Sequence, residues 1–261
     1  MTGLAIEVHQ LGKRFDIGKR VGGRGMHQLY EEAVRGVVRK LRIGQKVEQQ
    51  SARENAHILW ALRDVNLSIH HGEIVGLIGH NGAGKSVLLK ILSRITSPTE
   101  GYALIQGKVG SMLEVGAGFH PEFTGRENLF LVGTILGMEI SEIRAKFDQI
   151  VQFAEVEEML DTPVKRYSSG MYVRLAFSVA AHLDANIMLF DEVIAVGDVN
   201  FRLKCLARIR EMAREGRTVI FVSHSMETLQ DLCPRTIVIN HGRIQHDGPT
   251  EQILQKYRYH P

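Results

Sequence analysis

The stretch GHNGAGKS, residues 79–86, decides the fold of this chain. It fits the pattern G-x-x-x-x-G-K-[ST] and stands between an apolar run, EIVGLI at 73–78, and a run with helical spacing from Val87 to Leu92. In the order strand, glycine loop, helix, the backbone N–H groups of the loop turn inward around an anion, and the positive end of the helix adds to the attraction. The sequence therefore predicts a phosphate-binding loop.

The residue types of this loop indicate how it would hold ATP. Its glycines allow backbone conformations that a Cβ would forbid. Lys85 is expected to reach the outer phosphates as a point charge, and the Ser86 hydroxyl to complete the coordination of Mg²⁺. The alternative, a glycine-rich turn with a chance lysine, is disfavoured by the flanking strand and helix. The predicted nucleotide-binding residues of the loop are Gly79, His80, Asn81, Gly82, Ala83, Gly84, Lys85, Ser86 and Val87.

The composition limits the class of protein. The chain has 261 residues, 44% of them hydrophobic, which suits one large domain or one domain with a smaller attached lobe. Its net charge of +3 is too mild to indicate nucleic acid. Cys205 and Cys233 lack metal-ligand spacing and favour a reducing compartment. The start of the chain shows no signal-peptide pattern, and the uncharged apolar run 128–138 is shorter than the roughly 20 residues that span a bilayer. We therefore expect any membrane role to be peripheral.

Residues 16–56 differ from the rest of the chain and interrupt two predicted strands. The segment holds nine Lys or Arg residues against five acids. Its apolar side chains from Leu29 to Leu41 recur at helical spacing, which predicts a short amphipathic helix with a basic opposite face. Two interpretations remain open, a solvated surface helix and a helix set against a membrane or a partner. The segment is predicted to be an insertion.

Two further apolar runs are predicted to be buried parallel strands that end in reactive side chains. Ligands bind beyond the carboxyl ends of such strands. The run 187–190 ends at Asp191, which would hold the metal through the loop serine or a water molecule, and at Glu192, which would accept a proton from the attacking water. A helix-capping acid pair is the alternative. The run 218–222 leads to His224, which is expected to contact the γ-phosphate.

Two weaker signals concern the nucleotide. The sequence YSSGM, residues 167–171, opens a helix predicted to reach Leu183, and its polar, glycine-containing start could bind a second anion. A serine helix cap is the commoner explanation of such a start. Phe15, which follows a predicted strand at Leu4–His9, could stack on an adenine ring or belong to the core.

The remaining elements complete a mixed α/β pattern. A mainly helical stretch runs from Pro121 to Leu160, with Thr124, Ser141 and Asp161 as candidate caps and boundaries. Further strands are predicted at 60–69, 102–105, 108–113, 236–239 and 243–246, and a last helix at 252–257.

Taken together, these motifs resemble the ATP-binding subunit of an ABC transporter over essentially the whole chain. GHNGAGKS is similar to the Walker A loop, YSSGM to the signature, and IMLFDE at 187–192 to the Walker B strand, while 195–198 matches the D-loop and His224 the switch histidine. The resemblance implies an α/β fold, a P-loop NTPase core of ABC type with an antiparallel β subdomain and an inserted helical lobe. The expected organisation is a single domain, 1–261, with the basic insertion at 16–56, the helical lobe at 119–183 and a C-terminal helix at 251–261.

The same resemblance implies further site residues and a second copy of the chain. ABC ATPases sandwich ATP between the phosphate loop of one copy and the signature of the other. Glu114 stands where most of them have a glutamine that contacts Mg²⁺, and the signature departs from the usual L-S-G-G-Q while keeping its serine and second glycine. The resemblance assigns nucleotide contacts to Phe15, Glu114, Ser168, Ser169, Gly170, Met171 and Asp198, metal contacts to Ser86, Asp191 and Glu114, and catalysis to Glu192 and His224.

Three stretches are similar to the branch that exports bacterial surface polysaccharides: LEVGAGFHPEFTGRENL at 113–129, YSSGMYVRLAF at 167–177 and FDEVIAVGD at 190–198. The implied protein is an ATPase on the cytoplasmic face of the inner membrane. It would form a homodimer, bind an integral membrane permease and drive export of a lipid-linked polysaccharide, O-antigen first of all, without binding nucleic acid. The alternatives are an ATPase for capsule, teichoic acid or another ABC exporter, an importer or drug exporter, and a soluble regulatory ATPase.

Overall fold

The structure is a computed structural model that describes residues 3–17, 57–113, 118–191 and 198–259. The chain divides into two compact units, Met1–Lys13 with Trp60–Pro261, and Arg14–Leu59. Most of the predicted basic insertion lies in the second unit, at residues outside the described ranges, so its amphipathic helix stays a prediction. The fold below is that of the first unit together with the strands that lead out of it.

A three-stranded sheet has the order β2-β1-β4, with β1 at Leu4–Ile17, β2 at His57–His70 and β4 at Glu100–Ile105. β1 pairs with β4 in antiparallel register, Ile6 opposite Ile105. The predicted antiparallel subdomain is therefore confirmed. β1 is longer than the predicted strand at Leu4–His9. Gln10 has a positive φ of 45°, and the register shifts between His9 and Gly12. This shift breaks the alternation of side chains, so the sequence pattern ends before the strand does.

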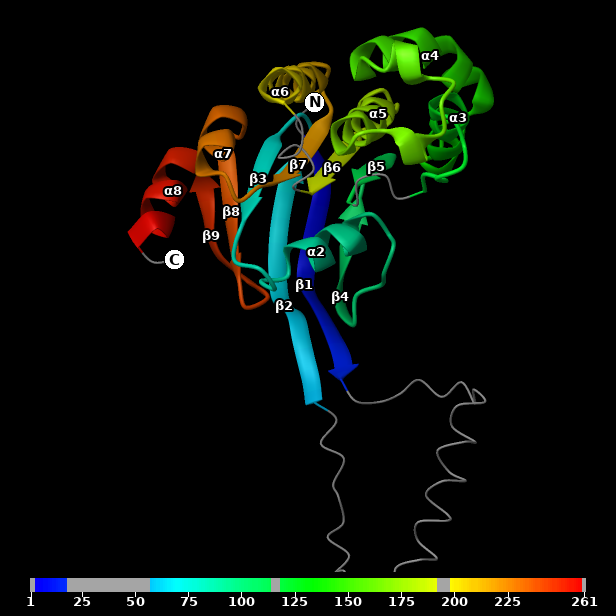
Figure 1. The fold of residues 1–261 in the computed structure, drawn as a ribbon. Helices are drawn as coiled ribbons and strands as arrows, with labels where there is room; N and C mark the ends of the chain where they lie inside the picture. The colour runs from blue at the N-terminus through cyan, green and yellow to red at the C-terminus, as the bar shows by residue number, and fades with distance from the viewer. Residues whose placement is uncertain (1–2, 18–56, 114–117, 192–197, 260–261) are drawn as a thin grey trace, which may run out of the picture. The chain divides into compact units, whose positions relative to one another are not determined.

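A second sheet of six strands carries the centre of the fold, in the order β5-β6-β7-β3-β8-β9 (Figure 1). Its strands are parallel except for β9, which pairs antiparallel with β8. The strands are β3 (Ile74–Ile78), β5 (Val109–Met112), β6 (Ile187–Asp191), β7 (Thr218–Val222), β8 (Arg235–Asn240) and β9 (Arg243–Pro249). Because β6, β7 and β3 are neighbours, their carboxyl ends meet at one edge of the sheet.

The central strands are apolar throughout because both faces of the sheet are covered. In β6, Met188 and Phe190 join one hydrophobic cluster, and Ile187 and Leu189 join another. The first cluster includes side chains of the helices α3 to α8, and the second includes α2 and the three-stranded sheet. These four β6 side chains are fully buried. The strands beside the nucleotide site are thus held from two sides.

The helices are α2 (Lys85–Leu92), α3 (Gly125–Ile135), α4 (Ile140–Ala154), α5 (Ser169–Ala181), α6 (Val199–Arg214), α7 (Met226–Leu232) and α8 (Thr250–Tyr259). α3, α4 and α5 lie together beside the β5 edge of the larger sheet in Figure 1. Thr124 caps α3 as predicted, in a capping box with Glu127. Ser141 does not cap α4; Glu139 holds the cap position, and Ser141 lies inside the first turn. None of the described helices combines the length and the apolar character that crossing a membrane requires.

Candidate nucleotide site

The phosphate loop joins the end of β3 to the start of α2, as the sequence predicts. Gly84 occupies the cap position of α2 in the left-handed region, with φ 108°, and no side chain caps this helix start. The first N–H groups of α2 are therefore available to an external acceptor, and the positive end of the helix dipole faces the same way. This is the arrangement that binds phosphate at a helix N-terminus.

The loop glycines are needed for two different reasons. Gly82 and Gly84 have φ values of 80° and 108°, which residues with a Cβ rarely adopt. At Gly79, by contrast, a Cβ would stand 2.1 Å from the carbonyl oxygen of Ile239 in β8. Gly79 thus lets the loop pass close to a neighbouring strand, whereas the other two allow it to turn.

Lys85 is enclosed by the loop that precedes it. The residue is only 7% exposed, and its Nζ donates to the carbonyl oxygens of Gly79 at 2.7 Å and His80 at 3.1 Å. Burial lowers the pKa of Lys85, and the negative charge of Asp191 partly offsets that effect. The ammonium group is therefore held inside the concave side of the loop, where a bound phosphate would share it.

Ser86 and Asp191 meet across the site, although 105 residues separate them in sequence. The Ser86 Oγ donates to Asp191 Oδ2 at 3.0 Å. A hydroxyl and a single carboxylate are hard oxygen ligands, and Mg²⁺ is usually held by one or two such groups together with substrate phosphates and water. Among the described residues no group of three or more His, Cys, Asp or Glu side chains could hold a metal alone. The pair fits Mg²⁺ that arrives with a nucleotide.

His224 follows β7 and lies in the electrostatic field of the same cluster. Partial burial lowers its pKa; the positive charge of Lys85 lowers it further, whereas Asp191 raises it. A neutral imidazole is thereby favoured near neutral pH, and it can donate to or accept from a phosphate oxygen. The carboxyl ends of β3, β6 and β7 therefore bring together Lys85, Asp191 and His224.

The predicted second anion site lies at the start of α5. The Ser168 side chain caps this helix and accepts from the backbone N–H of Met171 at 3.2 Å. Tyr167, the residue before this cap, is also held in place: its hydroxyl donates to the carbonyl oxygen of Met159 at 2.9 Å. Ser169, Gly170 and Met171 form the first turn. Both predicted readings of Ser168, cap and anion ligand, fit the same geometry.

Several predicted site residues cannot be placed. Glu114, Glu192 and the predicted D-loop residues 195–197 lie outside the described ranges, so the proposed base and the third metal contact stay predictions. Asp198 is described: it caps α6 by accepting from Phe201 N at 3.0 Å, and it also accepts from Arg174. Phe15 is 44% exposed and belongs to the Arg14–Leu59 unit, so its contact with adenine also stays a prediction.

Two neighbours of these residues were missed by sequence reasoning. The ring of Tyr257 in α8 lies 6.1 Å from that of His80 in the phosphate loop. Arg174 in α5 bonds to Asp198. Neither contact leaves a local signal, because each joins residues that are distant in the sequence.

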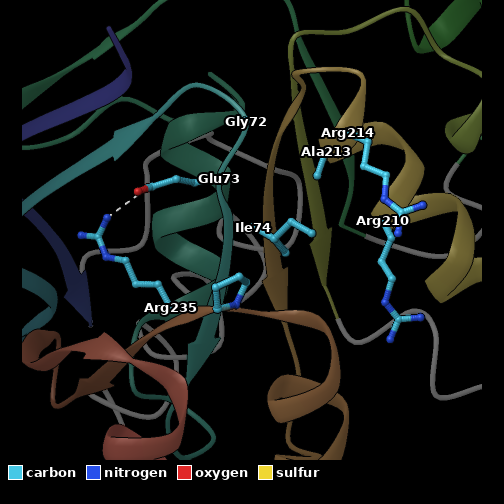
Figure 2. Close-up of a pocket in the computed structure, with 8 residues that line it drawn as sticks. Gly72, Glu73, Ile74, Arg210, Ala213, Arg214 and Arg235 are labelled. Carbon is cyan, nitrogen blue, oxygen red and sulfur yellow. Dashed lines mark hydrogen bonds and ion pairs between the residues drawn. The ribbon is translucent and has the colours of Figure 1, made fainter. Parts of the chain in front are cut away.

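A hollow of about 470 Å³ lies at the amino-terminal ends of strands in the larger sheet, away from the carboxyl ends that carry the predicted nucleotide site (Figure 2). Glu73 and Arg235 stand on one side of it, and Arg210 and Arg214 of α6 on the other. Arg235 already pairs with Glu73 at 3.1 Å and with Asp247 at 2.7 Å. The hollow is at the amino ends of β3 and β8, whereas parallel sheets bind ligands at the carboxyl ends, so we place no nucleotide there.

Comparison with known sequences identifies relatives of the whole core. The family model described as ABC transporter matches residues 62–195. An O-antigen export system ATP-binding protein, RfbB, of Klebsiella pneumoniae is 42% identical over 198 residues, 76% of this chain and 80% of the relative. RfbB of Myxococcus xanthus is 45% identical over 204 residues, but this chain spans only 47% of its length. The teichoic acids export ATP-binding protein TagH of Listeria monocytogenes is 41% identical over 198 residues, covering 76% of this chain and 59% of the relative.

Solved structures show the same fold at low sequence identity. A dimeric ATP-binding cassette in a post-hydrolysis state with ADP and phosphate superposes with a TM-score of 0.70 at 20% identity, covering 94% of this chain and 98% of that one. The ATP-binding subunit of an ABC transporter gives 0.72 at 20% identity, with 97% and 93% covered. The predicted ABC-type P-loop fold is confirmed by these neighbours. From the phosphate loop, the strand ends beside it and the family match, it follows that the chain is a nucleotide-binding ATPase that belongs to the ABC transporter family.

Proposed function

We propose that the chain powers export of a lipid-linked surface polysaccharide, O-antigen first of all, through a separate integral membrane permease. The observation that carries the chemistry is the pair Ser86 and Asp191, 3.0 Å apart, beside the buried ammonium of Lys85. The substrate class rests on the relatives that are named for O-antigen export and are 42–45% identical. Relatives named for teichoic acid export are 41–42% identical, so a teichoic acid ATPase is the second candidate.

In this proposal each strand end has one task in ATP hydrolysis. Lys85 and the N–H groups of α2 would bind the phosphates, and Ser86 with Asp191 would hold Mg²⁺, whose chemistry when bound is to neutralise charge on the transferred phosphoryl group. Glu192 accepts a proton from the attacking water, and neutral His224 donates to the γ-phosphate. Loss of that phosphate would remove charge that bridges the two copies of the chain.

The proposed working unit is a pair of chains. Each chain has two helix starts suited to an anion, at Lys85 of α2 and at Ser169 of α5. ATP would lie between the first helix start of one copy and the second of the other, so that binding closes the dimer and hydrolysis opens it. The permease would receive this movement at the cytoplasmic face of the inner membrane.

A test of the substrate combines deletion with complementation. Cells that lack the chain are expected to lose surface polysaccharide and to accumulate the lipid-linked polymer inside, because synthesis continues while export stops. The intact chain should restore the surface polymer; Glu192→Gln should not, while it retains ATP binding. A normal amount of surface polysaccharide in the deletion strain would rule out this function, and loss of teichoic acid alone would select the second candidate.

Residues 16–56 are proposed to act in export rather than in hydrolysis. Their excess of basic side chains suits an anionic lipid surface near the permease. A chain without residues 20–50 should keep the ATPase rate of the purified protein and fail to restore surface polysaccharide in the deletion strain. Loss of both activities together would instead show that the segment supports the fold.

A further inference from the structure

We propose that Arg174 is a positioning residue that ties the start of α5 to the start of α6, and thereby couples the two nucleotide sites of a dimer. Arg174 lies on α5, about one and a half turns after the Ser168 cap. Its Nη2 donates to Asp198 Oδ2, and its Nη1 donates to Glu155 Oε2 at 2.8 Å. One guanidinium thus joins α5 to the cap of α6 and to the end of α4. The inference rests on the paired arrangement proposed above.

Each carboxylate also accepts a second bond, and in both cases the donor belongs to α6. Asp198 Oδ1 accepts from the Phe201 N–H at 3.0 Å. Glu155 closes α4 in the left-handed conformation, with φ 56°, and its Oε1 accepts from Lys204 Nζ of α6 at 2.8 Å. Bonds from Phe201 N–H and from Arg174 lower the pKa of Asp198, and bonds from Lys204 and the charge of Arg174 lower that of Glu155. Both groups are therefore ionised at neutral pH.

Aromatic packing holds the two cations in place. The Arg174 guanidinium lies 5.2 Å from the ring centre of Phe201, and Lys204 Nζ lies 4.8 Å from that of Phe153. Phe153 and Phe201 also pack against each other, 5.9 Å between centroids. The side chain of Arg174 is only 21% exposed. The guanidinium is consequently shielded more than that of an ordinary surface ion pair, whose contribution is usually small, whereas the Glu155 and Asp198 side chains are 49% and 45% exposed.

The positions of the linked residues give the network its functional meaning. Ser168, at the start of α5, would face the ATP bound by the partner copy. Asp198 follows Asp191, the proposed metal ligand for the chain's own ATP, by seven residues in sequence. A shift of α5 on binding the partner's ATP would therefore be passed through Arg174 to the chain's own catalytic segment. Coupling of this kind is reciprocal and is typically worth a factor of about 5 to 150 in equilibrium constants.

A fold-stabilising role alone would look different, and the same part of the chain offers a comparison. Arg126 of α3 makes a two-bond pair with Asp161, at 2.7 and 3.2 Å, but the side chains are 45% and 74% exposed. Neither residue contacts α5 or α6 by any bond among the described residues. Arg126→Gln is thus a matched control that removes an arginine-carboxylate pair without touching the proposed connection.

The experiment measures ATP hydrolysis by the purified full chain over a range of ATP concentrations, together with ATP-dependent dimerisation and the thermal midpoint. For Arg174→Gln we expect ATP affinity of the single chain within twofold of wild type, maximal turnover lowered about tenfold and a Hill coefficient that falls toward 1. Arg174→Lys should recover part of the loss, because its ammonium keeps the charge but reaches one carboxylate well rather than two. Arg126→Gln should match wild type in turnover and Hill coefficient.

Two results in the variants would overturn the inference. The first is wild-type turnover and cooperativity in Arg174→Gln. The second is a loss of turnover in both Arg174→Gln and Arg126→Gln that simply follows the fall in their thermal midpoints. That result would mean that the contacts of Arg174 only stabilise the fold. If wild type itself neither dimerises with ATP nor shows cooperativity, the paired arrangement is wrong and the inference falls with it; if wild type shows both and Arg174→Gln is unchanged, only the inference falls.

Discussion

α2 and α5 both begin at a predicted phosphate contact, but their first turns are built in opposite ways. α2 begins with a left-handed glycine and no side-chain cap, whereas α5 begins with Ser168, whose hydroxyl already accepts the N–H of Met171. The first helix leaves its donors open to a ligand. The second satisfies one donor within the chain.

The contacts that position the two helix starts also differ, by backbone for α2 and by side chains for α5. α2 is preceded by a loop locked between β3 and β8, since Gly79 has no room for a Cβ beside Ile239. α5 is held through side chains: Tyr167 reaches Met159, and Arg174 reaches Asp198 and Glu155. The phosphate loop is therefore shaped by the backbone of one chain, whereas the signature is positioned by side-chain contacts between helices. This difference suits a site whose first half binds ATP and whose second half closes on it.

Removal of Lys85 should disable the α2 half of the site and give the largest loss of ATP binding and hydrolysis. Lys85→Ala deletes a buried cation that bonds to Gly79 and His80 oxygens and would neutralise the outer phosphates. A charge-assisted bond of this kind is worth about 2–3 kcal/mol, so ATP affinity should fall about a hundredfold and hydrolysis should fall to background. Calorimetric titration with ATP measures the change. Lys165→Ala, which removes an exposed pair with Glu122, should bind ATP like wild type, and equal binding by both variants would refute the role of Lys85.

Substitutions of Ser168 should separate the two tasks of the α5 start. Ser168→Ala loses the cap and about 1 kcal/mol of stability, while Ser168→Asp keeps a capping oxygen but adds negative charge where the partner's phosphate is expected. Ser168→Asp should therefore be more stable than Ser168→Ala. Ser168→Ala should in turn dimerise with ATP more tightly than Ser168→Asp, by about tenfold in the dimerisation constant.

The test compares thermal unfolding with sedimentation of the ATP-bound protein on a Glu192→Gln background, which is expected to prevent hydrolysis if Glu192 is the base. Single-chain ATP affinity should be the same in both Ser168 variants, because the α2 site is complete without α5. If dimerisation follows stability instead, with Asp above Ala, Ser168 is a cap and nothing more.

The same contrast explains which parts of the molecule the sequence could predict. The phosphate loop, Asp191 and His224 were found because each follows an apolar run, and parallel strands collect their carboxyl ends at one edge. The 3.0 Å contact of Ser86 with Asp191 agrees with that argument. The role of Glu192 and Glu114 stays a prediction, since both lie outside the described residues.

Features placed by long-range side-chain contacts were not predictable in this way. Arg174 reads as one polar residue on an amphipathic helix, and nothing near it in sequence indicates Asp198 or Glu155 as partners. The wrong cap at Ser141 has a local cause: Glu139 already has the extended backbone of a cap, so the helix begins two residues earlier. The end of β1 was placed too early because the register shift next to Gln10, which has a positive φ, interrupts the alternation on which strand prediction depends.

The smallest predicted effect concerns the C-terminal end of α5 and the pH dependence of stability. Three cations donate to its last carbonyl oxygens: Lys146 to His182, Arg208 to Ala181 and Arg217 to Leu183. His182 lies among them, and its Nδ1–H donates to the Ser178 carbonyl at 2.7 Å. Burial lowers the pKa of His182, and the charges of Arg208, Lys146 and Arg217 lower it further, whereas the bond to Ser178 raises it.

Because the pKa of His182 is lower in the folded chain than its ordinary value of 6.5, the unfolded chain binds more protons in this range, and stability should fall as pH drops below about 6.5. One such group contributes a slope of at most about 1.4 kcal/mol per pH unit. His182→Gln keeps a donor for the Ser178 carbonyl but cannot titrate, so its free energy of unfolding should vary less between pH 6.5 and 5 than that of wild type. Denaturant titrations across this range provide the measurement, with exposed His246→Gln as the control. An unchanged slope in His182→Gln would mean that this end of α5 tolerates the extra charge, and that its packing against α4 and α6 is looser than the three cation contacts imply.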